Sequence, residues 1–475
     1  MRSLKKKLGF LSLSMIFLCL HSAAFAADKV VYPEQEKTRI VILTDIGNEP
    51  DDSESFVRFL TYSNEFDIES IVATTSTWQR DQVHPEMLLK RINAYAQVYT
   101  NLIKHATGYP LPTELSAKVI SGRAGCGMKY VGDGKSTEAS KRIIAVVDKA
   151  DDRPVWITVW GGAVDLAQAL WDVKNSRTPD QVEAFIKKIK IYSISDQDNT
   201  GAWIRRNFPE MTWISSLHAY NDYWLATWIG ISAPMAEGGD MSQVNNNWIA
   251  KNIQLGPLGK QYPPLMYIME GDTPSFLYLL RNGLNTPDHP EYGGWGGRYA
   301  AVAPDDTSGL RTSTSDNVQG VDGKIYKTAP ATIWRWRHQF QNDFAARMQW
   351  TLSDAYHKAN HNPVVVLNEQ QGIAPVALTV HAGEQVKLSV KGSYDPDKNT
   401  LKYKWWQYAE PTANALQIHF APELKLTHTA KEQLEFIAPN VKQPTPFHII
   451  VEVKDNGTPE LFSYRRAIVT VLPTP

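Results

Sequence analysis

The chain has 475 residues, and its 49 Lys and Arg residues nearly balance its 50 Asp and Glu residues, for a formal net charge of −1. This length predicts two or three domains, and the balanced charge with no basic stripe argues against a nucleic-acid partner. After the N-terminal segment, no stretch approaches the roughly 18 uncharged apolar residues that a membrane span needs.

The first 26 residues have the pattern of a secretory signal peptide. A basic segment over residues 2–7 precedes an apolar stretch over residues 8–20, and Ala24-Phe25-Ala26 forms a small-x-small cleavage pattern. We therefore expect an exported, soluble mature protein, either secreted or periplasmic. Its sole remaining cysteine is Cys126, so no internal disulfide can form and the fold depends on its hydrophobic core.

Strand-like and helix-like runs alternate between residues 38 and 231, which predicts an α/β domain with a mostly parallel sheet flanked by helices. The apolar runs are nearly continuous, as expected for strands that are buried on both faces. The predicted strands cover residues 39–45, 68–76, 154–162, 188–196 and 211–216, and the predicted helices cover residues 51–63, 84–103 and 164–173.

The pattern changes twice after this alternation. Residues 232–359 are rich in Gly, Pro and Trp, and we expect long loops around the functional face of the sheet, followed by a helix over residues 332–359. From about residue 365, short alternating strands with turn residues between them predict an all-β immunoglobulin-like sandwich over residues 365–475. Its Trp405 and Trp406 alternate, so at most one of them faces the core of the sandwich.

A burst of carboxylates follows the first predicted strand, in the stretch VILTDIGNEPDD. Asp45 ends the strand, and Asp51 and Asp52 begin the next helix. Capping and the helix dipole explain one carboxylate at a helix N-terminus, but not Asp45 together with both others. Clustered carboxylates at a buried strand end need a cation, and ligands that are all oxygen favour calcium or magnesium.

This stretch resembles the D-x-D-x-G-x-D-D fingerprint of the nucleoside hydrolase family. Asp45 matches its second aspartate, and Asp51 and Asp52 match its final pair, whereas Leu43 replaces its first aspartate and the loop is two residues longer. Two later stretches match the family in the same order. WGGAVDLAQAL places the carbonyl of Trp160 where the family has a calcium ligand, and MEGDTPSF places Asp272 at a late ligand aspartate, after a short strand.

The chain is most similar to the Sde182-like subgroup of this family, in which a β-sandwich follows the nucleoside hydrolase-like domain. The motifs TDIGNEPDD, WGG and EGDTPSF carry the similarity, which implies a nucleoside hydrolase-like domain over residues 38–360. It also implies a Ca²⁺ ion held by Asp45, Asp52, Trp160 and Asp272, and a catalytic role for Asp45 and Asp51. In that scheme Asp45 takes a proton from a calcium-bound water that attacks the sugar.

Other polar and aromatic residues follow strands at the same edge and are candidates for binding substrate. Alternative interpretations are a polar turn for residues 196–199 and a structural loop around residue 295. Glu270 and Asp272 alternate along the chain, so both are expected to reach the site, and His218 and Glu270 are candidates for the general acid. The candidate substrate-binding residues are Trp78, Asp198, Asn199, His218, Asn221, Glu270, Trp295 and Arg298.

We therefore expect a secreted glycosidase that cleaves a glycosyl bond of an oligosaccharide or glycoconjugate. Export favours a glycan over a free nucleoside, because nucleosides are salvaged mainly inside cells. The alternatives are an N-ribosyl nucleoside hydrolase and a non-catalytic protein that binds a carbohydrate such as cellulose. The sequence leaves the sugar, the anomeric outcome and the oligomeric state open.

Overall fold

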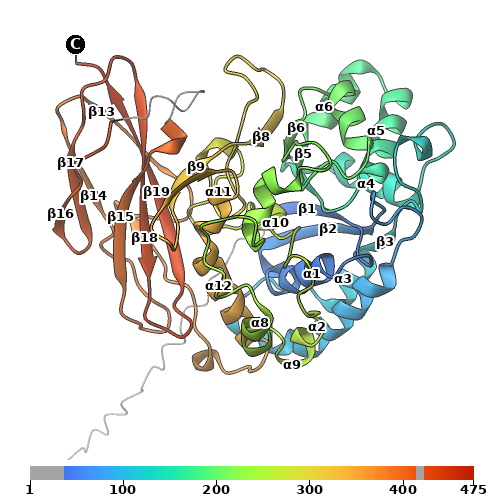
Figure 1. Cartoon of the computed structure of the whole chain (residues 1–475), viewed down its shortest axis with the longest axis horizontal. Coiled ribbons are helices and arrows are strands. Elements are labelled where there is room, and N and C mark those ends of the chain that lie inside the picture. Colours follow the sequence, from blue (N-terminus) through green and yellow to red (C-terminus); the bar gives the residue numbers. More distant parts are fainter. Residues whose placement is uncertain (1–36, 413–421, 475) are drawn as a thin grey trace, which may run out of the picture.

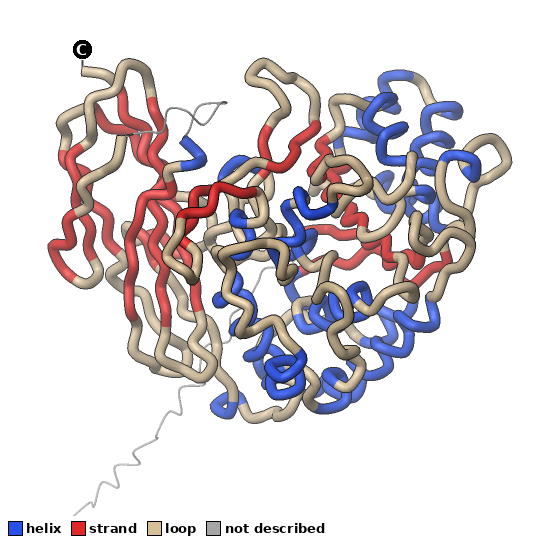
Figure 2. Tube along the Cα trace, viewed as in Figure 1, coloured by secondary structure: helices blue, strands red, loops and turns tan. Residues whose placement is uncertain are grey.

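The computed structural model describes residues 37–412 and 422–474, and the predicted signal peptide lies outside these ranges. The described residues form a helix-covered sheet that is joined to a β-sandwich (Figure 1). Figure 2 shows the two groups of strands, with most helices gathered around the first group. No helix in the described ranges combines the length and the apolar character needed to cross a membrane.

The central sheet has the strand order β3-β2-β1-β4-β5-β6-β8-β7, and its neighbours are parallel except for β7 and β8. This confirms the predicted mostly parallel sheet. The carboxyl ends of β1, β4 and β5 therefore meet at one edge, where ligands bind in folds of this kind. The strands are β1 Thr38–Thr44, β2 Phe66–Ala73, β3 Val119–Ser121, β4 Val155–Val159, β5 Ile189–Ser193, β6 Thr212–Ser215, β7 Tyr299–Ala300 and β8 Leu310–Ser313.

Helices cover both faces of this sheet, as the continuous apolar strands require. Along β1, Ile40 and Ile42 join one apolar core, while Val41 and Leu43 join the core on the opposite face. The helices of the first half are α1 Asp51–Thr61, α2 Pro85–His105, α3 Pro112–Lys118, α4 Glu138–Asp148, α5 Val164–Ser176, α6 Pro179–Lys187 and α7 Thr200–Asn207.

The segment expected to be loops contains several short elements. The predicted helix over residues 332–359 is divided at Arg335 and Trp336, and it ends at Trp350, whose indole donates to the carbonyl of Asn360 where the chain turns back. The elements are α8 Asn246–Asn252, α9 Gly256–Gly259, α10 Pro274–Leu277, β9 Asp316–Gln319, β10 Ile325–Thr328, α11 Ala331–Trp334 and α12 Arg337–Trp350.

Two facing sheets with orders β13-β19-β18-β15 and β14-β17-β16 form the sandwich, and a small β11–β12 hairpin precedes them. Trp405 is buried in its core, whereas Trp406 packs on Trp336 of the first domain, so the expected alternation is present. The strands are β11 Val366–Leu367, β12 Gln370–Gln371, β13 Val376–His381, β14 Gln385–Ser389, β15 Lys402–Tyr408, β16 Thr427–Ala430, β17 Gln433–Ile437, β18 Thr445–Lys454 and β19 Phe462–Leu472.

The sandwich shares a core with the first domain. Tyr408, Ile450 and Tyr464 of the sandwich belong to the same buried apolar cluster as the first-domain residues Trp295 and Trp336. The backbone nitrogen of Tyr464 also donates to the carbonyl of Asn282 at 3.1 Å. The β9–β10 hairpin, α11 and α12 lie between the central sheet and the sandwich (Figure 1). This interface therefore fixes the two domains together.

Candidate functional site

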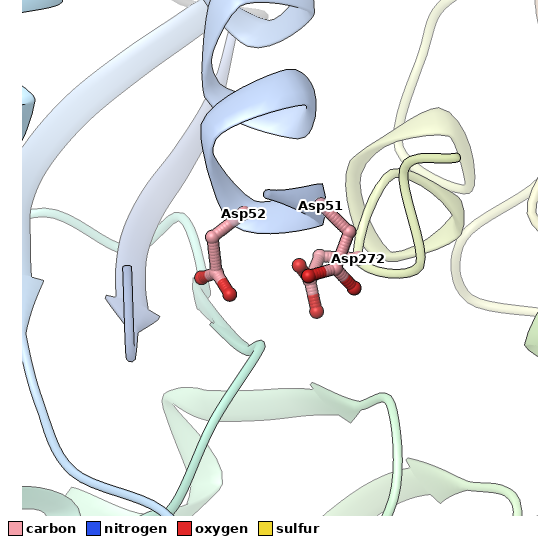
Figure 3. A group of neighbouring side chains, drawn as sticks. All are labelled: Asp51, Asp52 and Asp272. Atoms are coloured by element: carbon pink, nitrogen blue, oxygen red, sulfur yellow. The ribbon is translucent and has the colours of Figure 1, made fainter. Parts of the chain in front are cut away.

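Four aspartates gather where β1 ends and α1 begins, and we call Asp45, Asp51, Asp52 and Asp272 the acidic cluster. Asp45 directly follows β1, Asp51 and Asp52 are the first residues of α1, and Asp272 lies just before α10. One oxygen from each of Asp51, Asp52 and Asp272 lies within 4.8 Å of the others. Figure 3 shows two of these side chains hanging from the first turn of α1, with Asp272 beside Asp51.

Two glycines allow the backbone to approach these carboxylates. A Cβ atom on Gly161, in the turn after β4, would overlap the carboxylate of Asp45. A Cβ atom on Gly271 would lie 2.7 Å from Oδ2 of Asp51. The glycines of the WGG and EGD motifs therefore have a steric role, because a side chain at either position would displace a carboxylate of the acidic cluster.

Burial raises the pKa of every aspartate in the acidic cluster. The pKa rises to about 6 for Asp45 and to about 8 for Asp51, and it lies well above the ordinary value for Asp52 and Asp272. After burial, the charges of neighbouring carboxylates, including Glu49, raise the pKa values further. The cluster is therefore unfavourable as a set of anions unless positive charge accompanies it.

The donor atoms of the acidic cluster fit a hard cation such as calcium. Oδ1 of Asp51 and Oδ2 of Asp272 are buried and have no hydrogen-bond partner in the described part of the chain. Asp52 accepts a hydrogen bond from the hydroxyl of Thr44, and the carbonyl of Trp160 accepts one from the Gln197 amide, so each retains a free lone pair. Carboxylate and carbonyl oxygens are the ligands that calcium prefers.

The structure groups the aspartates differently from the sequence assignment. Asp51, expected to act in catalysis, lies with Asp52 and Asp272 in the group that could hold a metal. Asp45, expected to act as both ligand and base, stands beside this group and accepts a hydrogen bond from the Ser76 side chain. The expected short strand before Asp272 is absent from the described residues, because residues 263–273 form loops and turns.

Exposed aromatic rings stand beside the acidic cluster, and we call Trp78, Tyr220 and Tyr223 the aromatic wall. Trp78 is 47% exposed and Tyr220 is 56% exposed, and their rings stack with centroids 5.7 Å apart. Tyr223 contacts both rings. Burial and then neighbouring charges, including Asp45 and Glu49, raise the pKa of Tyr223 to about 12, so this ring lies close to the carboxylates.

Two candidate substrate-binding residues lie in the loop that carries Tyr220 and Tyr223 of the aromatic wall. The half-buried ring of His218 packs on Tyr223 at 4.9 Å, and its Nε2 atom lies 3.2 Å from the hydroxyl of Ser195. Asn221 is exposed in the same loop. These positions are compatible with contact to a ligand at the acidic cluster.

Asp198 and Asn199 follow β5 and line a neighbouring pocket, but part of their polar capacity is already used. The Asp198 carboxylate accepts hydrogen bonds from the backbone of Gly127 and from Thr200, and Oδ1 of Asn199 accepts one from the backbone of Met128. The polar-turn interpretation therefore accounts for the Asp198 carboxylate, while the Asn199 amide nitrogen remains available to a ligand.

Three candidate residues point away from the acidic cluster and correct our expectations. Glu270 has a positive φ of 57°, which breaks the expected alternation with Asp272, and its fully buried carboxylate pairs with Arg58. Trp295 is buried in the domain interface, where its indole donates to Tyr464. Arg298 is also buried there and pairs with Asp316.

Glu49, Tyr220 and Tyr223 also belong to the site but were not among the predicted site residues. Glu49 adds negative charge to the acidic cluster, and the two tyrosines complete the aromatic wall. Glu49 was visible as part of the acidic burst. The tyrosines flank the selected Asn221, but nothing local in the sequence indicates that their loop reaches the one carrying Trp78.

Comparison with known proteins gave two family matches and an extensive structural match. Residues 39–299 match the nucleoside hydrolase-like domain of cellulose-binding Sde182, and residues 385–471 match the C-terminal domain of cellulose-binding protein Sde0182. A nucleoside hydrolase-related hypothetical protein from Saccharophagus degradans, described as associated with carbohydrate metabolism, is 35% identical. That match covers 92% of this chain and 100% of the other, with a TM-score of 0.77.

Two further solved structures are similar to only part of this chain. The protocadherin GammaB4 extracellular domain is 17% identical over 23% of this chain and 16% of its own, with a TM-score of 0.16. The titin M3 domain is 13% identical over 23% of this chain and 96% of its own, with a TM-score of 0.14. Both scores are too low to support an argument. The comparison with curated proteins found no match.

Proposed function

Since this chain belongs to the Sde182 nucleoside hydrolase-like family, we propose that it is an exported glycosidase that hydrolyses a glycosyl bond of an oligosaccharide or glycoconjugate. The observation that carries the proposal is the acidic cluster, with its two unpartnered oxygens, next to the aromatic wall. Acidic groups for hydrolysis and exposed rings for sugar binding thus meet at the carboxyl edge of the sheet.

The residues at this edge of the sheet have different roles in the proposed reaction. Asp51, Asp52, Asp272 and the carbonyl of Trp160 would hold calcium, with Asp45 beside them. When bound, calcium supplies positive charge that acidifies water and orients sugar hydroxyls. Asp45 accepts the proton of the attacking water, and the surrounding carboxylates stabilise the positive charge that develops on the sugar ring.

His218 is the candidate general acid for the leaving group. Its ring is half-buried beside Tyr223 and within hydrogen-bond distance of Ser195, so its orientation is constrained. Glu270, the other candidate, is excluded from this role by its buried pairing with Arg58. A protonated imidazole beside the aromatic wall would lie near the part of the substrate that leaves.

The aromatic wall favours a glycan substrate. Trp78 and Tyr220 present ring faces of the kind on which sugars pack. The matching family is described as cellulose-binding, and the Saccharophagus degradans protein is described as associated with carbohydrate metabolism. A nucleoside is the alternative substrate, because the first domain has a nucleoside hydrolase-like fold. A nucleobase would stack on the same rings, so both substrates belong in the first assay.

A non-catalytic carbohydrate-binding protein is the second candidate function. The two additional residues between Gly47 and Asp51 alter the spacing of the nucleoside hydrolase fingerprint, and the matching family models are described as cellulose-binding. In that case the aromatic wall would bind sugar while the acidic cluster had only a structural role.

The Asp45→Asn variant separates hydrolysis from binding. We expect the wild-type protein to release sugar from at least one member of a panel of plant and microbial oligosaccharides and nucleosides in calcium buffer. Asp45→Asn should lower that rate by 10²-fold or more, since it removes the base, while the affinity for the same compound changes little. Equal rates for the two proteins would contradict the assigned base, and binding without turnover by the wild type would favour the second candidate function.

A further inference from the structure

A second pocket opens next to the acidic cluster. Its volume is about 330 Å³, and three separate loops, around residues 77–80, 126–129 and 197–199, line it. The first of these loops also carries Trp78, so the same short segment borders both the pocket and the aromatic wall. A ligand bound on the wall would therefore have the pocket as a neighbour.

Direct contacts connect the pocket with the acidic cluster. Gln197 lies in the pocket lining, and its side-chain amide nitrogen donates a hydrogen bond to the backbone carbonyl of Trp160. Its backbone carbonyl accepts a hydrogen bond from the backbone nitrogen of Thr77 at 2.8 Å. A Cβ atom on Gly162 would lie 2.7 Å from Oδ2 of Asp198, and one on the preceding Gly161 would overlap Asp45. One turn after β4 thus separates the pocket from the proposed base.

The pocket lining contains two exposed cationic side chains, Arg80 and Lys129. Burial raises the pKa of the Cys126 thiol, and the charges of Arg80 and Lys129 oppose that rise, so both cations lie near Cys126 in the lining. The Nζ atom of Lys129 lies 4.9 Å from the centroid of the Tyr130 ring. The Nε and Nη2 atoms of Arg80 donate to Thr77, which holds the guanidinium in place and leaves Nη1 for a ligand. A held guanidinium loses less freedom on binding than a mobile one.

The single carboxylate in the lining does not compete for these cations. Oδ1 of Asp198 accepts hydrogen bonds from the backbone and the hydroxyl of Thr200, and Oδ2 accepts them from Gly127 and Cys126. Oε1 of Gln197 is a buried acceptor without a partner among the described residues, whereas the free groups on the exposed side chains of the lining are the two cations and the Asn199 amide nitrogen. They are all hydrogen-bond donors, and a set of donors with positive charge is complementary to an anion.

We propose that this pocket binds an anionic substituent of the substrate, such as a uronic acid carboxylate or a sulfate ester, on a sugar next to the one that reacts. The inference rests on the proposed function in that it takes the acidic cluster as the reacting centre. The substrate class is then an acidic oligosaccharide, with one sugar on the aromatic wall and a charged neighbour held by Arg80 and Lys129.

Binding measurements on defined trisaccharides test this subsite. The probes are trigalacturonate, a sulfated galactan trisaccharide and neutral cellotriose, titrated calorimetrically into the full chain in calcium buffer. We expect at least one anionic probe to bind about tenfold more tightly than cellotriose, with the difference shrinking between 50 and 200 mM salt. The Arg80→Gln/Lys129→Gln double variant should lose this preference and keep its affinity for cellotriose.

Controls make the outcome specific to the pocket. Lys90→Gln removes an exposed charge on α2 and should leave the preference intact. A preference for only one anionic probe would identify the anion, whereas no preference in the wild type, or a preference that survives in the double variant, would overturn the proposal. Hydrolysis by Asp45→Asn tests the proposed function separately: if that variant remains active while the double variant loses the charge preference, the subsite stands and the assigned mechanism fails.

Discussion

The acidic cluster and the domain interface both bury carboxylates, but they compensate the charge differently. At the interface, Asp316 accepts hydrogen bonds from Arg298, Arg335 and the hydroxyl of Tyr408 at 2.6 to 2.8 Å. In the acidic cluster, buried oxygens of Asp51 and Asp272 have no such partner among the described residues. A carboxylate paired within the chain serves the fold, whereas an unpaired one leaves a place for a ligand.

The pKa values of the buried carboxylates shift in opposite directions in the two regions, because their charged neighbours have opposite signs. Burial opposes ionisation of Asp316, but the charges of Arg298 and Arg335 outweigh it and lower the pKa of this carboxyl. In the acidic cluster, burial and neighbouring carboxylates act together and raise the pKa values. Neutralising one carboxylate should therefore destabilise the protein in one region and stabilise the metal-free protein in the other.

The largest effect is expected at the interface. Asp316→Asn removes the carboxylate that pairs with both buried arginines, Arg298 and Arg335, and leaves only the more distant charge of Glu410 near them among the described residues. Breaking a buried pair in this way costs about 3–5 kcal/mol. We expect the free energy of unfolding in urea to fall by about 3 kcal/mol, with or without calcium. The control is Asp322→Asn, which neutralises an exposed carboxylate in the turn of the same hairpin and should change stability by less than about 0.5 kcal/mol. Equal losses for the two variants would contradict the assigned pairing.

Calcium should stabilise the folded protein through the acidic cluster. A ligand that binds only the folded state stabilises it by about 2.7 kcal/mol at a hundredfold excess over its dissociation constant. We expect calcium to raise the thermal midpoint of the wild type relative to chelator, and Asp52→Asn to lose most of that rise. In chelator, Asp52→Asn should be more stable than the wild type by about 1 kcal/mol, since it removes a buried like charge.

Asp316→Asn is the matched control for this calcium experiment. It lowers the thermal midpoint but should keep the full calcium-dependent rise, because the interface lies outside the acidic cluster. A wild-type protein whose midpoint ignores calcium would show that the cluster manages its charge without this metal. A calcium response that persists in Asp52→Asn would place the ion elsewhere in the chain.

The contrast also explains which parts of the molecule could be predicted from the sequence. The pattern of β1 and the acidic burst after it are local, so the strand, the helix start and the gathering of Asp45, Asp51 and Asp52 could be predicted from a few residues. The parallel arrangement of the strands followed from their alternation with helices, and parallel strands place their carboxyl ends at one edge. The resemblance to nucleoside hydrolases added Asp272, which lies more than 200 residues later.

The domain interface could not be predicted, because residues on one side of it can be recognised as interface residues only when their partners on the other side are known. Trp295 and Arg298 stand in a stretch rich in Gly that resembles a loop at a binding site, and their partners Asp316 and Tyr464 belong to elements that follow later in the chain. Glu270 was misplaced for a different reason. Its left-handed backbone conformation turns the side chain toward Arg58, and a sequence pattern that assumes an extended chain does not show this turn.

The smallest predicted effect concerns His448 at the domain interface, where burial disfavours the protonated form of the ring. His448 is buried in β18, where its Nδ1 atom accepts a hydrogen bond from Arg466 and its ring contacts Tyr292. Burial lowers the pKa of His448 to about 2, and the charges of Arg466 and His289 contribute. His448 binds a proton near pH 6.5 in the unfolded chain but stays neutral at that pH in the folded chain. The free energy of unfolding therefore decreases as the pH falls below about 6.5.

We therefore expect the wild type to lose about 1–2 kcal/mol of unfolding free energy through His448 between pH 7 and pH 5. His448→Gln removes the titrating ring, so its stability should fall less steeply over that range even if its stability at pH 7 is lower. The exposed His381→Gln variant should retain the wild-type slope. Urea titrations at several pH values, all in chelator, give these slopes while keeping calcium binding out of the comparison. If His448→Gln and the wild type had the same slope, His448 would have to be protonated in the folded protein, and the interface would then accept a buried charge, which the raised pKa values in the acidic cluster show to be costly for anions.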